Sequence, residues 1–121
     1  KNKKRIIFSR DLSNFRFVNN NHVYFNPNQT TFDEIIKKIL PATTICILGG
    51  TTVYDYFMNN KLLDELIITI EPITFRRGLP LFSQIKWKNF IDHFIKDGFV
   101  LAKEIKKINK NGTKYFHLLK N

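Results

Sequence analysis

The sequence has little cysteine, little proline or glycine, and no long apolar run. It contains one cysteine, four prolines and five glycines in 121 residues. A single cysteine, Cys46, excludes an intramolecular disulfide framework and suits a reducing compartment. No stretch approaches the roughly 18 apolar residues of a membrane helix. The basic start, Lys1 to Arg5, is followed only by Ile6-Ile7-Phe8, which is too short for the apolar region of a signal peptide. We therefore expect a cytoplasmic protein with no membrane partner.

Acidic residues are also scarce. Twenty Lys and Arg stand against ten Asp and Glu, a net charge of +10. Clustered cations would favour nucleic-acid binding because they neutralise phosphates. Here the lysines are scattered, apart from residues 1–5 and 103–114, and no RNP motif, helix-turn-helix or zinc finger accompanies them. We expect a solvated basic surface and no nucleic acid partner, with nucleic-acid binding as the alternative that charge alone allows. The charge also suits an anionic small ligand.

Apolar residues are plentiful and evenly spread. They make up 43% of the chain and include twelve Phe, which predicts a folded globule rather than a disordered segment. The length suits one domain with a real core. We find no internal repeat or linker, and expect residues 1–121 to form a single domain.

Short apolar runs alternate with helical patterns along the chain. The run Thr44–Leu48 is continuous and rich in β-branched residues, as buried parallel strands are, so Cys46 within it is predicted to be a buried, inert thiol. Together these patterns predict an α/β fold with a mixed, mostly parallel sheet and a C-terminal antiparallel hairpin. The expected elements are strands at Arg5–Ser9, His22–Phe25, Thr44–Leu48 and Leu66–Ile70, helices at 32–39 (capped by Thr30 or Thr31) and 53–58, and hairpin strands at Phe99–Ile108 and Thr113–Leu119 around Asn111-Gly112.

The Gly49-Gly50 pair is the sharpest chemical feature. An apolar strand is expected to run into the two glycines, and a helix to start directly after them. This arrangement presents free backbone N–H groups and the positive end of a helix dipole, and glycine lets a phosphate approach the backbone. Thr51 and Thr52 add hydroxyls that can cap the helix or bind phosphate oxygens. A plain tight turn is the alternative. The Rossmann and P-loop fingerprints are absent.

Four segments in this order resemble the dihydrofolate reductase superfamily. They are LGGTTVY at 48–54, LLDELIITI at 62–70, GLPLF at 78–82 and NGTKYF at 111–116. Within that superfamily the chain is most similar to the reductase domain of the riboflavin-biosynthesis deaminase–reductase. The likeness runs from about Arg5 to Leu119. It implies a three-layer α/β sandwich in which the family's first strand and helices are missing from this chain.

The resemblance also implies a function. A member would be a cytoplasmic, NADPH-dependent oxidoreductase that transfers a hydride to a pterin or a ribosylated pyrimidine, in folate metabolism or riboflavin biosynthesis. Its partner would be that small heterocyclic substrate, and a homodimer is expected. The alternative is a non-catalytic, truncated remnant of the same fold that binds nucleotide or serves as an interaction module.

Particular residues receive roles from the resemblance. Arg10 would pair with the 2′-phosphate of NADPH, since a guanidinium binds phosphate bidentately; a solvated arginine at a strand end is the alternative. Tyr54 would lie near the nicotinamide, and Thr69 would support the substrate pocket. The implied cofactor-binding residues are Ser9, Arg10, Leu48, Gly49, Gly50, Thr51, Thr52, Val53 and Tyr54.

No catalytic residue and no metal site can be nominated. Asp11, Asp33 and Asp64 lie at the ends of expected elements, where caps and solvated carboxylates are common. The three histidines, His22, His93 and His117, lack metal-ligand spacing. The family's catalytic acid is expected in the part that this chain lacks.

Overall fold

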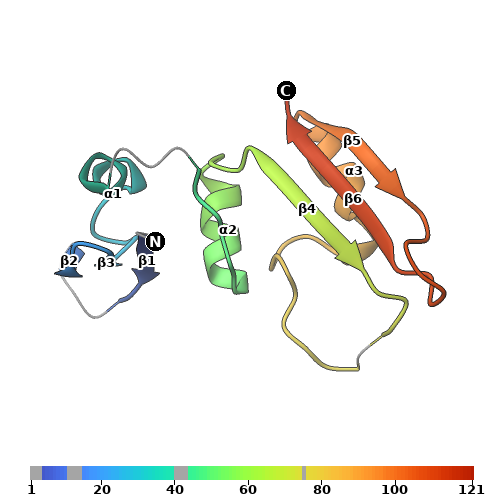
Figure 1. Ribbon diagram of the computed structural model, residues 1–121, viewed down its shortest axis with the longest axis horizontal. Helices are drawn as coiled ribbons and strands as arrows, with labels where there is room; N and C mark the ends of the chain where they lie inside the picture. Colours follow the sequence, from blue (N-terminus) through green and yellow to red (C-terminus); the bar gives the residue numbers. More distant parts are fainter. Residues whose placement is uncertain (1–3, 11–14, 40–43, 75) are drawn as a thin grey trace. The chain divides into compact units, whose positions relative to one another are not determined.

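The computed structural model describes residues 4–10, 15–39, 44–74 and 76–121. The chain divides into two compact units, Lys1–Ile47 and Leu48–Asn121, each with its own three-stranded sheet (Figure 1). This confirms the α/β class, while the expectation of a single domain stays a prediction. In chain order the elements are β1 (Arg5–Phe8), β2 (Phe15–Asn19), β3 (His22–Phe25), α1 (Phe32–Ile39), α2 (Thr51–Asn59), β4 (Glu65–Ile70), the 3₁₀ turn η1 (Trp87–Asn89), α3 (Phe90–Lys96), β5 (Phe99–Ile105) and β6 (Lys114–Lys120).

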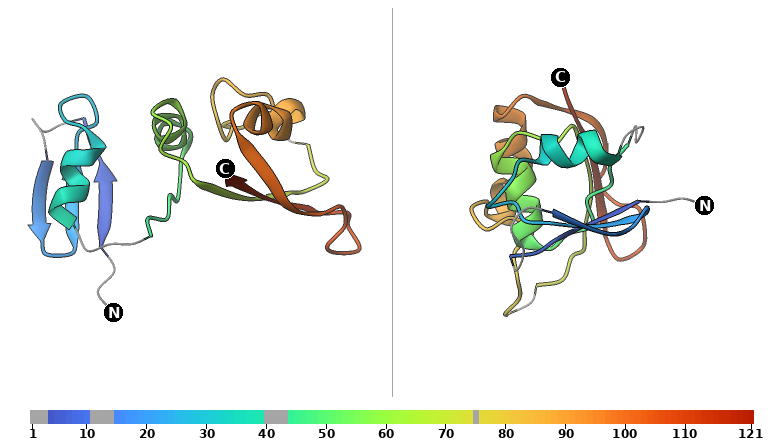
Figure 2. Two further views of the ribbon diagram at one scale, coloured as in Figure 1. Left: turned by 90° about the horizontal axis from the view of Figure 1, so that it is seen from above. Right: turned by 90° about the vertical axis from the view of Figure 1, so that its left-hand side faces the viewer.

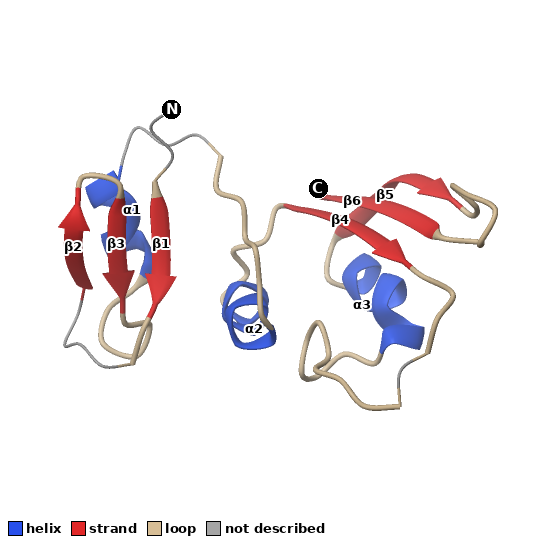
Figure 3. Ribbon diagram, turned by 60° about the horizontal axis from the view of Figure 1, so that its bottom comes forward, coloured by secondary structure: helices blue, strands red, loops and turns tan. Residues whose placement is uncertain are grey.

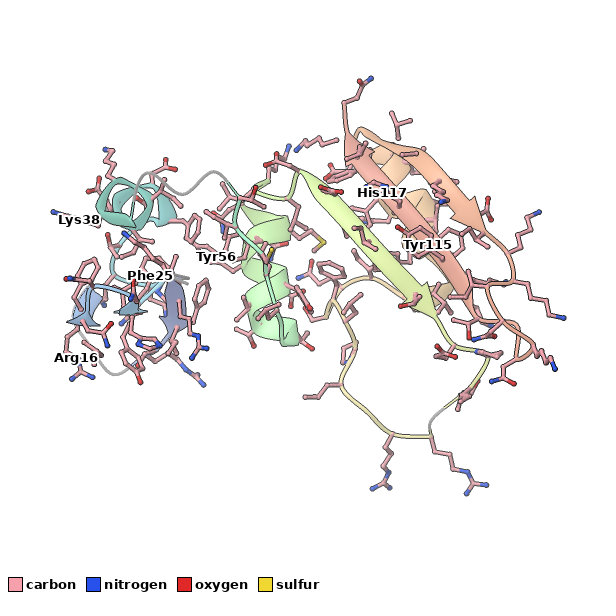
Figure 4. The ribbon with its side chains drawn as sticks, in the orientation of Figure 1. Arg16, Phe25, Lys38, Tyr56, Tyr115 and His117 are labelled. Atoms are coloured by element: carbon pink, nitrogen blue, oxygen red, sulfur yellow. The ribbon has the colours of Figure 1, made fainter. Side chains whose placement is uncertain are left out.

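The first unit is a sheet with one helix on one face. Its strand order is β1-β3-β2, with β1 parallel and β2 antiparallel to β3. Alternate residues of β3, Val23 and Phe25, are buried beneath α1, which covers that face (Figures 2 and 3). The Phe25 and Phe32 rings meet edge to face, with centroids 6.1 Å apart. On the other face Arg16 lies over the Tyr24 ring, pointing away from α1 (Figure 4). Because successive side chains of β3 point to opposite faces of the sheet, one face forms the core and the other faces outward.

Strand β2 was not expected, because Arg16 and the asparagines make its stretch look polar. It pairs with β3 as a hairpin with a bulge between Phe17 and Asn19. The Asn19 side chain closes the turn, since its Oδ1 accepts a hydrogen bond from the Asn21 N–H at 2.8 Å. Asparagine favours such turns by bonding its own backbone two residues on. Two sequence features could therefore have predicted this hairpin: the asparagine-rich turn, and the alternation of Phe15 and Phe17 before it.

The second unit is a fully antiparallel sheet covered on one face by α3 (Figure 1). The strand order is β4-β6-β5, and the predicted hairpin of β5 and β6 is confirmed. Its core is a cluster of aromatic rings around Phe94, whose centroid lies 5.1 Å from Phe90, 5.4 Å from Phe82 and 5.3 Å from Phe99. Helix α3 is not among the elements predicted from the sequence, although Phe90 and Phe94 stand at helical i, i+4 spacing.

Two expectations about the sheet are wrong for the described residues. Thr44–Leu48 forms no strand, and Ile45, Cys46 and Leu48 are exposed, so the Cys46 thiol is not buried. Of the strand pairings described, only β1–β3 is parallel. A strand exists through hydrogen bonds to a neighbour, and apolar content alone does not supply that neighbour. Among the described residues, every helix falls short of the length and apolarity needed to span a bilayer.

Replacing Phe94 by alanine should strongly destabilise the fold. Phe94 is 0% exposed at the centre of the ring cluster, so its loss should lower the free energy of unfolding by about 3–5 kcal/mol. The adjacent Ile95, 45% exposed on the same helix, is the control, and Ile95→Ala should cost less than about 1 kcal/mol. Urea unfolding followed by far-UV circular dichroism measures both. Equal losses would contradict the assignment of Phe94 to the core.

Candidate functional site

The Gly49-Gly50 turn leads directly into α2. Gly49 has φ +108°, a conformation that residues with a Cβ rarely adopt. A Cβ at this position would also lie 3.1 Å from the Tyr54 hydroxyl and 3.2 Å from two ring carbons. Gly49 is therefore required by the backbone and by the Tyr54 ring that packs against it.

Gly50 differs from Gly49 in both respects. Its backbone is extended, with φ −61° and ψ −163°, and a Cβ there would meet nothing within 4 Å. Since neither conformation nor packing requires glycine at this position, the bare backbone leaves one side of the turn open. An incoming group can approach the chain closely there.

The first turn of α2 has donors available. Gly50 is the N-cap and provides no side-chain cap, while its carbonyl accepts the Tyr54 N–H at 3.0 Å. The N–H groups of Thr51, Thr52 and Val53 precede the first acceptor that a helix can offer. They point outward at the positive end of the helix dipole, where an anion is stabilised.

The loop Gly78–Phe82 folds onto this helix start. The Thr51 hydroxyl donates a hydrogen bond to the Pro80 carbonyl, and the Tyr54 and Phe82 rings have centroids 5.8 Å apart. One turn further along α2, Asp55 Oδ1 accepts the Ser83 N–H at 2.9 Å. Two of the segments that carry the family resemblance are thus in direct contact. This bond uses the proton of the Thr51 hydroxyl. The oxygen lone pairs and the backbone N–H of Thr51 can still bind a ligand.

A groove of about 870 Å³ lies beside the end of β4. Its lining is mainly apolar and includes Thr69, the residue predicted to support the substrate. Pro80 and Phe82, which contact α2, line it as well. One loop therefore borders both the glycine turn and the groove that contains Thr69, an arrangement that sequence spacing did not reveal. Lys86 and Lys88 also line the groove and were not predicted as site residues.

The remaining predicted residues are Leu48, at the start of the second unit, and Ser9 and Arg10, in the first unit. Leu48 is 92% exposed just before the turn. Ser9 and Arg10 follow β1 in the first unit, where the Ser9 N–H donates to the Phe25 carbonyl at 2.8 Å and Arg10 is exposed. Their cofactor roles stay predictions. Asp11 lies outside the described residues.

The described residues contain no group of three or more His, Cys, Asp and Glu side chains that could hold a metal ion. His117 Nε2 lies 2.6 Å from Glu65 Oε1. Tyr115 and His117 project from the same face of β6 (Figure 4). The contact between His117 and Glu65 is not predicted from the sequence, because the two residues are 52 positions apart.

Comparison with known proteins adds one relative. No family model matches the chain. The chain is 32% identical over 85 residues to the uncharacterized protein YyaP of Bacillus subtilis (strain 168). The match covers 69% of this chain and 43% of that protein, so the chain spans less than half of the relative's length. The likeness is one of sequence and assigns no activity.

The two glycines should respond differently to alanine. Gly49→Ala should lower the free energy of unfolding by at least about 1–2 kcal/mol, because it forces a Cβ into a positive φ and against Tyr54. Gly50→Ala, which meets open space, should change it by no more than about 0.5 kcal/mol. Thermal unfolding of the two variants measures the difference. A larger loss for Gly50→Ala would refute this geometry of the turn.

Proposed function

We propose that this chain is a nicotinamide-dependent reductase domain of the dihydrofolate reductase superfamily, using NADPH to reduce a pterin or a ribosylated pyrimidine. The observation that carries the proposal is the contact between the Gly49-Gly50 turn with its helix and the loop Gly78–Phe82. These are two of the four segments on which the resemblance rests, and nothing in their sequence spacing requires them to touch. The groove with Thr69 lies against the same loop.

The glycine turn supplies what a pyrophosphate needs. The outward N–H groups of Thr51, Thr52 and Val53 donate to its oxygens, and the open side of Gly50 lets it reach the backbone. The net charge of +10 raises the local concentration of an anionic cofactor. The family resemblance assigns recognition of the 2′-phosphate to Arg10. The half-buried Tyr54 ring packs against Gly49 and so supports the turn, and the family resemblance assigns this ring to the neighbourhood of the nicotinamide.

The groove suits a flat heterocycle. Ile68, Ile70 and Phe82 provide apolar surface, and the Thr69 hydroxyl can both donate and accept a hydrogen bond. The bound nicotinamide supplies the hydride, while the protein orients the ring and excludes water. In folate or riboflavin metabolism such a step consumes one NADPH for each heterocycle reduced.

A binding function without turnover is the second candidate. Among the described lining residues the one carboxylate is that of Glu71, and it accepts a hydrogen bond from the Thr113 hydroxyl at 2.7 Å. A general acid must reach the substrate with a proton, and this carboxylate is already engaged as an acceptor. That observation favours a domain that binds the nucleotide but lacks its own proton donor.

Titration calorimetry with NADPH and NADH tests cofactor binding. The full chain should bind NADPH, and Gly50→Val should raise the dissociation constant at least tenfold by filling the open side of the turn. Gly78→Val is the matched control, because a Cβ there also meets nothing within 4 Å, and it should bind like the unaltered chain. Failure of the unaltered chain to bind either cofactor would refute the proposed function.

Arg10→Ala should separate the two cofactors. Loss of a charge-assisted contact of about 1.5–3 kcal/mol predicts NADPH binding weakened roughly 10- to 100-fold, with NADH binding unchanged. The same titrations measure both values, and Arg5→Ala, at the start of the same strand, is the control. Equal weakening of NADPH and NADH would assign Arg10 a role other than recognising the 2′-phosphate.

A further inference from the structure

A chain of hydrogen bonds leads from the loop between β5 and β6 to the groove beside β4. It begins at Asn109, whose Oδ1 accepts the Asn111 N–H at 3.0 Å and the Thr113 N–H at 3.2 Å. These two bonds fix which side of the amide carries the oxygen, so that Nδ2, which can only donate, lies on the other side. Nδ2 lies 2.8 Å from Thr113 Oγ1. The Thr113 hydroxyl therefore accepts a hydrogen bond from Asn109.

The Thr113 hydroxyl in turn determines how Glu71 is bonded. Thr113 is 1% exposed, and its Oγ1 lies 2.7 Å from Glu71 Oε2. Because the oxygen already accepts from Asn109, the single hydroxyl proton is donated to Glu71. Glu71 is thus held as an acceptor. Asn109 does not line the groove, yet its side chain sets the hydrogen-bonding direction of a carboxylate that does.

Glu71 has acceptor capacity left for a ligand in the groove. An ionised carboxylate offers about four lone-pair positions, and the Thr113 hydroxyl uses one of them. Thr69, two positions earlier, lines the same groove with a hydroxyl that can donate. Residues two apart on a strand are separated by roughly 7 Å, so one planar ring can meet both side chains. Ile68 and Ile70 add apolar surface for the faces of such a ring.

We propose that Glu71 makes the groove specific for a heterocycle that presents two adjacent N–H donors, the 2-amino-4-oxo edge of a pterin. The 2-amino group and the neighbouring ring N–H donate to the Glu71 carboxylate, and the Thr69 hydroxyl donates to the 4-oxo oxygen. A 2,4-dioxo ring instead places a carbonyl oxygen against the carboxylate, and two acceptors repel each other. Asn109 and Thr113 are positioning residues. The inference rests on the proposed function and decides between its two substrate classes.

Pterin and lumazine test the proposal as a matched pair of ligands. They share one bicyclic ring and differ at position 2, where pterin carries an amino group and lumazine an oxygen. Fluorescence titration of each ring with the full chain, without cofactor, gives the two dissociation constants. The unaltered chain should bind pterin at least about tenfold more tightly than lumazine, because hydrogen bonds to a charged acceptor are the strong ones. Equal binding, tighter binding of lumazine, or binding of neither ring would overturn the proposal.

Glu71→Gln should abolish or reverse the preference. The Thr113 hydroxyl then donates to the amide oxygen, which turns the amide NH₂ toward the ligand. This donor suits the 2-oxo group, so the variant should bind lumazine at least as tightly as pterin. Glu104→Gln is the matched control, because it removes the same charge on β5 outside the groove, and it should keep the preference for pterin. A preference for pterin that survives in Glu71→Gln would refute the role of Glu71.

Asn109→Asp tests the positioning role. The new carboxylate still accepts the N–H groups of Asn111 and Thr113 but competes for the Thr113 proton, so Glu71 loses its donor. Pterin binding should weaken at least about threefold and lumazine binding should not, a split that general loosening of the loop would not produce. Asn111→Asp places the same charge in the same loop, on a side chain outside this chain of bonds, and should bind like the unaltered chain. Equal weakening by both variants would contradict the positioning role.

Cofactor titration of the same samples keeps this result separate from the proposed function. NADPH binding without discrimination between the two rings would overturn the role of Glu71 and leave the cofactor site in place. Discrimination between the rings without binding of either cofactor would support the role of Glu71 and refute the reductase proposal.

Discussion

Burial of the Phe82 ring links the candidate site to the core of the second unit. Phe82 is 2% exposed, and its ring contacts those of Tyr54, Phe90 and Phe94. Tyr54 in turn packs against Gly49. One buried side chain thus holds the loop, the start of α2 and α3 together. The glycine turn is held in its conformation by hydrophobic packing that begins more than thirty residues further along the chain.

This linkage explains why the two glycines have different roles. Gly49 is needed because Tyr54, held by Phe82, occupies the space that a side chain would take. Gly50 faces away from that packing and has no structural requirement for glycine. Packing does not explain why position 50 is a glycine. A ligand that must approach the bare backbone would explain it, and the proposed pyrophosphate is such a ligand. The same loop also lines the groove beside β4, so the glycine turn and the groove share one support.

Local patterns predicted several elements well. Helix α1, helix α2, strand β4 and the β5–β6 hairpin all follow from the apolar period and from turn residues near each element. The errors have a common cause. Thr44–Leu48 has the composition of a buried strand but no described partner, and β2 looks polar yet pairs with β3. Strand formation depends on a neighbour, which composition does not report.

The sequence by itself determined the α/β class, the glycine turn followed by a helix, the basic charge and the residues that the family resemblance assigns. These depend on residue type and on spacings within one or two turns of chain. Only the tertiary structure decided that the Pro80 loop meets Thr51, that Thr69 lines a groove, that Cys46 is exposed and that β4 is an outer strand of its three-stranded sheet. Those features arise from contacts between residues far apart in sequence. Packing chooses such contacts from many alternatives that the local pattern allows equally.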